Sequence, residues 1–122
     1  MNFWLLTSGI AMLLLSLVHI FLGGREIHLP MVKANWPDPA KAIWSVVWHI
    51  TTAMMIFGGL ALVAAAARPD LALALAALPL VLSASAAILF VVYSLTRLRT
   101  LRILPHWIAF SAITLVGTIG LL

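Results

Sequence analysis

Four histidines are the residues of this chain best suited to chemistry: His19, His28, His49 and His106. Neutral imidazole is a good ligand for iron, copper and zinc, and burial in apolar surroundings favours the neutral form. Two histidines on facing helices can hold the iron of a b-type haem from both sides. Three or four histidines, with Glu26 beside them, can instead hold one or two transition-metal ions. The chain has no cysteine, so thiolate metal sites and disulfides are excluded.

Two of these histidines belong to stripes of small and polar residues that recur at helical spacing. The first stripe is Ser8, Met12, Ser16, His19 and Gly23, and the second is Ser45, His49, Thr52 and Gly59. Stripes of this kind let helices approach closely in lipid. We therefore expect both to face inward, with the His19 and His49 imidazoles directed at each other. The comparable stripe that begins at His106 is less polar.

Four apolar stretches must position the histidines, at about residues 3–22, 43–66, 71–95 and 103–122. Each is long enough to cross a hydrocarbon core of about 30 Å as a helix. The chain has 122 residues, of which 65% are hydrophobic and 8% charged, and this leaves too little polar surface for a water-soluble globule. No alternating pattern of a spanning β-barrel is present. The sequence therefore predicts an all-α integral membrane protein, a bundle of four transmembrane helices that forms a single domain over residues 1–122.

The basic residues predict how this bundle is oriented. Six of the seven Lys and Arg residues lie in the first and third connectors: Arg25, Lys33, Lys41, Arg97, Arg99 and Arg102. The positive-inside rule places these connectors in the cytoplasm and both termini on the non-cytoplasmic side. All four histidines then share the cytoplasmic third of the protein, in what we expect to be a bacterial inner membrane. The net charge of +4 indicates attraction to anionic lipid headgroups and not nucleic-acid binding, because the basic residues form no separate domain.

Local signals predict the helix ends. Gly23 and Gly24 are expected to end the first span, and residues 23–42 to form a semi-apolar connector in the headgroup region. Asp38 is expected to cap the second helix and Asp70 the third. The tryptophans near the predicted cytoplasmic side are interpreted as an interfacial aromatic belt: Trp36, Trp44, Trp48 and Trp107.

Two short runs resemble a pattern in small uncharacterised bacterial membrane proteins with four spans. The runs are Leu17-Val18-His19-Ile20-Phe21-Leu22-Gly23 and Val47-Trp48-His49-Ile50-Thr51-Thr52, in the first half of the chain. Such proteins often read His-Ser-x-Leu-Gly-Glu, whereas this chain has Ile20 and Gly24 at the Ser and Glu positions. The resemblance implies no activity, but it implies that His19 and His49 belong to one unit.

Two functions of different classes fit the sequence. The first is a haem or transition-metal protein that carries out electron transfer or redox chemistry through His19, His49, His106 and His28. The second is a non-catalytic subunit that packs against a larger membrane complex or a second copy through small-residue faces, because a histidine near a membrane interface commonly serves only packing. A pore or carrier is disfavoured because no acidic residue lies within a predicted span. No phosphate-binding loop, HExxH motif or Ser-His-Asp set points to a specific enzyme.

Overall fold

The computed structural model describes all 122 residues; it is 86% helix and contains no strand. The α-helices are α1 (Phe3–Val18), α2 (Leu29–Lys33), α3 (Asp38–Ala67), α4 (Ala72–Tyr93) and α5 (His106–Ile119). The shorter elements are two π-helical segments, η1 (His19–His28) and η3 (Ser94–Leu98), and one 3-10 turn, η2 (Pro69–Leu71). The all-helical prediction is therefore confirmed.

Three continuous helices are long and apolar enough to cross a membrane. They cover Phe3–Lys33 with 31 residues, Asp38–Ala67 with 30 and Pro69–Leu98 with 30. The fourth helix, α5, has only 14 residues. It rises about 21 Å, less than a hydrocarbon core of about 30 Å, because residues 101–105 form bends and a turn before it begins. The apolar stretch expected at 103–122 is thus helical over a shorter range.

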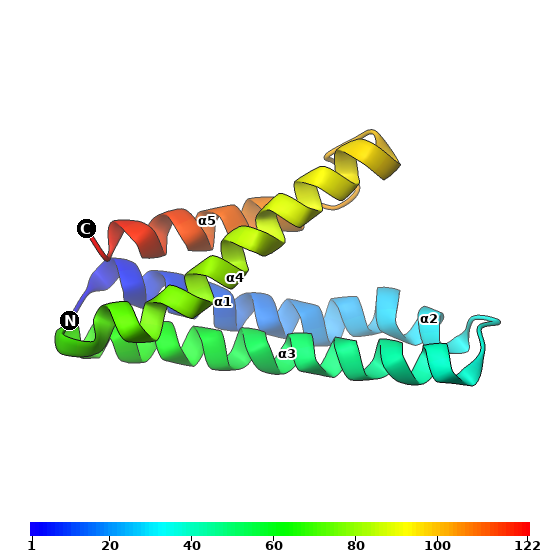
Figure 1. Ribbon diagram of the computed structural model, residues 1–122, viewed down its shortest axis with the longest axis horizontal. Helices are drawn as coiled ribbons and strands as arrows, with labels where there is room; N and C mark the ends of the chain where they lie inside the picture. Colours follow the sequence, from blue (N-terminus) through cyan, green and yellow to red (C-terminus); the bar gives the residue numbers. More distant parts are fainter.

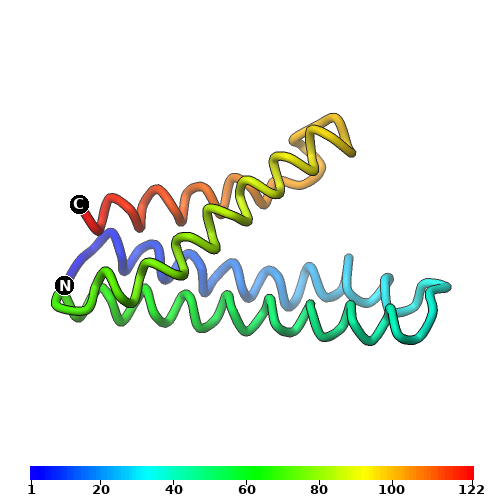
Figure 2. Tube along the Cα trace, in the orientation of Figure 1, coloured from blue at the N-terminus to red at the C-terminus, as the bar shows by residue number.

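The helices form two antiparallel hairpins, α1 with α3 and α4 with α5 (Figure 1). Both termini and the turn between α3 and α4 lie together at one end of the molecule, called here the termini end (Figure 1). The hairpins diverge toward the opposite end, called here the hairpin end, where the two hairpin connectors lie (Figure 2). Those connectors and the helix ends beside them carry the six basic residues predicted to share one face.

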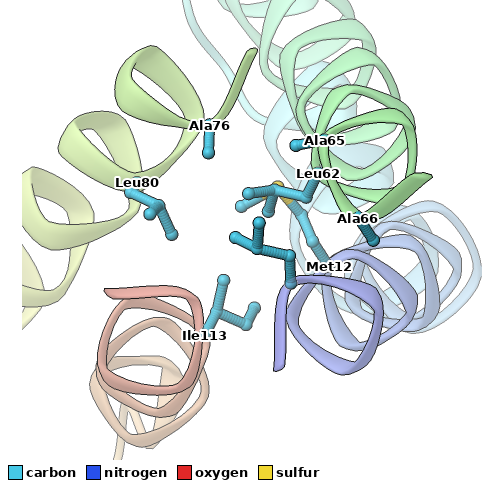
Figure 3. Close-up of a cluster of buried hydrophobic side chains, with 8 residues drawn as sticks. Met12, Leu62, Ala65, Ala66, Ala76, Leu80 and Ile113 are labelled. Carbon is cyan, nitrogen blue, oxygen red and sulfur yellow. The ribbon is translucent and has the colours of Figure 1, made fainter. Parts of the chain in front are cut away.

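The apolar core lies nearer the termini end and draws on all four long helices. Met12, Leu62, Ala76, Leu80 and Ile113 are buried and belong to one cluster. Their side chains converge from α1, α3, α4 and α5 (Figure 3). The inward stripe predicted for the first helix is confirmed here, because its serines and methionine are all buried.

Hydroxyl groups join the two hairpins inside this core. Ser8 Oγ on α1 donates a hydrogen bond to the Ile113 carbonyl at 2.8 Å, and Ser83 Oγ on α4 donates to the Phe110 carbonyl at 3.0 Å. Both bonds are buried. Because interhelical hydrogen bonds in membrane proteins contribute about 0.6 kcal/mol on average, they fix the position of α5 more than they stabilise the fold.

Asn2 links three helix ends at the termini end. Its side-chain oxygen accepts hydrogen bonds from the Trp4 and Leu5 amides at 3.1 Å each, which caps α1. Its side-chain nitrogen donates to the Gly120 carbonyl at 2.6 Å, and its backbone amide donates to the Ala66 carbonyl at 2.8 Å. The starts and ends of α1, α3 and α5 are therefore tied together through one residue.

The expected helix end at Gly23 and Gly24 is wrong. The helix continues through both glycines as η1 and α2 to Lys33, and the connector shrinks to residues 34–37. Neither glycine adopts the positive φ that ends helices. Gly23 instead serves packing, because a Cβ at this position would lie 3.0 Å from a ring carbon of Trp48.

The two predicted aspartate caps are also absent. Asp38 is the first residue of α3, with Pro37 at the cap position, and Leu71 occupies the cap position of α4. Asp70 forms an exposed ion pair with Arg68 instead, at 2.8 Å. The hydrogen bond from the Arg68 guanidinium lowers the pKa of Asp70, but an exposed pair of this kind adds little to stability.

Candidate functional site at the hairpin end

The helical repeat brings His19 and His106 to the same level of the bundle. Leu15 on α1 packs against the buried cluster that contains Phe110 of α5. His19 lies four residues after Leu15 toward the hairpin end, and His106 lies four residues before Phe110 in the same direction. Each is thus about one turn beyond that contact, and the two imidazoles lie within electrostatic reach of each other. The structure therefore places these two histidines, from different hairpins, in one region.

Aromatic stacking holds both imidazoles in place. The His19 ring stacks on Trp48 of α3, with centroids 4.0 Å apart and planes 17° apart. The His106 ring stacks on Phe90 of α4 at 4.9 Å and 15°, and Phe90 stacks in turn on Phe110 at 5.9 Å and 12°. Offset stacking of this kind contributes about 0.5–1.5 kcal/mol per pair, so each imidazole has a preferred orientation.

His49 and His28 lie elsewhere in the first hairpin. The expected contact between His19 and His49 is not formed, because Trp48 occupies the face of α3 that meets His19 and the adjacent His49 is exposed. His49 contacts His28 edge-on at 5.6 Å, and His28 also stacks on Trp48 at 5.1 Å. Successive residues on a helix point about 100° apart, so only one of Trp48 and His49 can face inward.

The expected set of metal ligands is not assembled as one cluster. Glu26 is exposed on η1. No group of three or more His, Asp or Glu side chains is arranged to hold a metal ion. The histidines instead form two pairs: His19 with His106 between the hairpins, and His28 with His49 within the first hairpin.

Several buried polar atoms around these pairs have no hydrogen-bond partner. They are His19 Nε2, His28 Nδ1, Trp44 Nε1, Ser94 Oγ and His106 Nδ1. An unsatisfied polar group in an apolar interior costs about 1–3 kcal/mol. The buried serines of the core, in contrast, all donate to carbonyls: Ser8, Ser16 and Ser83. The hairpin end is therefore the part of the bundle where a bound group would satisfy atoms that the protein leaves unpaired.

Sequence reasoning missed three residues of this site: Trp48, Phe90 and Ser94. Trp48 was interpreted as part of an interfacial belt, although its seven-residue spacing from the buried Met55 and Leu62 marks the inward face of α3. Ser94 is fully buried and continues the face of α4 that begins at Ser83. Phe90 was included only in a packing face.

No family model, no curated protein and no solved structure matches this chain. The resemblance to four-span bacterial membrane proteins therefore stays a prediction. The interpretation of the site rests on its own geometry and chemistry.

Proposed function

We propose that this chain is an integral membrane protein whose four long elements cross a bacterial inner membrane, with the termini end outside and the hairpin end in the cytoplasm. Three helices of sufficient length and apolarity support this proposal. The six basic residues at the hairpin end support its orientation, and they suit contact with anionic headgroups. The short α5 would cross with help from its flanking residues and from local thinning of the bilayer.

Within this bundle, His19 and His106 are proposed to hold a haem iron for electron transfer. The observation that carries the proposal is the pair of buried, unpartnered imidazole nitrogens supplied by different hairpins. A haem needs only two axial protein ligands, whereas a bare metal ion needs three or more. Because the site brings two histidines together and no larger donor group, haem fits it better than a metal ion alone. His28 and His49 would then act outside the coordination sphere.

An absorption spectrum and an iron analysis of the gently purified protein test this proposal. We expect a Soret band with about one iron per binding site, lost in His19→Ala and in His106→Ala. His49→Ala is the matched control: it removes an exposed imidazole and should keep the spectrum. A colourless, iron-free protein whose stability is the same in all three variants would eliminate the haem proposal.

A second candidate is a non-catalytic subunit of a larger membrane complex or of a homo-oligomer. The divergence of the hairpins favours it, since an opening between two helical pairs can accept a helix from another chain (Figure 2). This candidate predicts a defined complex after mild solubilisation. A lone monomer, seen by size-exclusion chromatography with light scattering, would count against it.

A further inference from the structure

An apolar groove runs between α1 and α5. It has a volume of about 440 Å³, and eight of its ten lining residues are hydrophobic. The other two are already hydrogen-bonded within the protein, because Thr7 Oγ1 donates to the Phe3 carbonyl and Ser8 Oγ donates to the Ile113 carbonyl, both at 2.8 Å. No charged side chain lines the groove. Along its length it therefore suits an uncharged hydrocarbon chain and penalises a charged one.

One end of this groove lies beside the candidate site. The lining residues nearest the hairpin end are Val18 on α1 and Ala109 on α5. His19 directly follows Val18, and His106 precedes Ala109 by three residues, about one helical turn. The unpartnered nitrogens of both histidines are thus near this end, while no unpartnered polar atom belongs to a residue that lines the groove. The seam between α1 and α5 is apolar over several turns and capable of hydrogen bonding at one end.

We propose that this seam binds a lipid-soluble quinone, with its prenyl tail in the groove and its ring near His19 and His106. The polarity of the ligand matches that of the seam: the tail is neutral hydrocarbon, and the ring carbonyls accept hydrogen bonds from imidazole N–H groups. The flat ring also suits a site walled by Trp48 and Phe90. A phospholipid fits less well, because its phosphate needs a cationic partner and the side chains of Arg25 and Arg102 are exposed.

The role of the quinone as an electron partner rests on the proposed haem function, but its binding does not. Binding therefore gives a test of its own. Saturable quenching of tryptophan fluorescence by a short-tailed benzoquinone reports occupancy, since Trp48 lies against His19. The measurement uses the full chain in detergent micelles.

Four variants distinguish tail binding from head binding. Ala112→Phe fills the groove from an exposed lining position and should weaken binding about tenfold or more. Ala77→Phe is the matched control, because Ala77 is equally exposed but lies on α4 outside the groove, and it should bind as the parent does. His19→Ala and His106→Ala each remove one hydrogen-bond donor and should weaken binding about twofold to tenfold.

The outcomes separate this proposal from the haem proposal. Quinone binding that follows this variant pattern in a protein without a Soret band supports the quinone site and removes the haem. A Soret band without saturable quinone binding supports the haem and overturns the quinone site. Equal affinity in Ala112→Phe and Ala77→Phe overturns it as well, and so does equal competition by a phospholipid or by an alkane without a ring.

Discussion

Substitution of Gly9 by Ala tests how closely α1 and α3 must approach. A Cβ at Gly9 would lie 2.9 Å from the Gly59 carbonyl oxygen, 2.9 Å from the Val63 amide nitrogen and 2.8 Å from a Val63 methyl carbon. Comfortable separations are about 3.5–4.0 Å, and two of the three atoms belong to the backbone, which cannot move aside alone. The helices would therefore have to separate. Overpacking of this kind costs about 1–3 kcal/mol, against which Ala gains up to about 1 kcal/mol over Gly in helix propensity.

Gly24→Ala is the matched control, because no atom lies within 4 Å of a Cβ at Gly24. It keeps the gain in propensity and has no steric cost. The difference between the two variants in free energy of unfolding should therefore be about 1–3 kcal/mol, with Gly9→Ala the less stable. Equilibrium unfolding in mixed micelles, followed by far-UV circular dichroism, measures both. If Gly9→Ala is as stable as Gly24→Ala, the close contact between α1 and α3 is refuted.

Three further predictions concern the helix ends and use the same unfolding assay. Asn2→Ala should destabilise the protein by about 1–2 kcal/mol, since it removes a cap and an interhelical hydrogen bond, whereas Asn35→Ala, at an exposed position without side-chain hydrogen bonds, should have no effect; equal stabilities would contradict the three-helix link. Arg99→Gly should stabilise by about 1 kcal/mol, because Arg99 ends its helix at φ 53°, a left-handed conformation that disfavours side chains, and a loss of stability would argue against this helix end. Because Arg68 lowers the pKa of Asp70, any stability from this pair is present above the usual carboxyl pKa and lost as the pH falls through the lowered one; Asp70→Asn should abolish that acid dependence, and an unchanged acid limb would contradict the pairing.

Composition and periodicity predicted the architecture well because both follow from the solvent. The apolar stretches gave four helices in two antiparallel hairpins, and the basic residues correctly grouped both hairpin tips at one end. The inward face of the first helix was also predictable, since Ser8, Met12 and Ser16 recur at helical spacing and are all buried. The length of α5 was not, because hydropathy does not reveal where the backbone bends around residues 101–105.

The site was harder to predict because it depends on helix rotation. Two faces of α3 looked plausible, one through His49 and one through Trp48, and the polar stripe pointed to His49. The structure turns Trp48 inward, where its ring stacks on His19 and packs over Gly23. A glycine that was interpreted as a helix end is thus a glycine that admits an indole. The pairing of His19 with His106 depends on contacts between distant segments, which a helical pattern alone cannot reveal.

The central claim is that the imidazoles of α1 and α5 share one space at the hairpin end. Because the chain has no cysteine, the double variant His19→Cys with His106→Cys can be cross-linked without interference by a short bis-maleimide in native membranes. We predict efficient cross-linking of this pair and little for His49→Cys with His106→Cys, since His49 is exposed on another face. Absence of the first cross-link, or equal yields for the two pairs, would contradict the account.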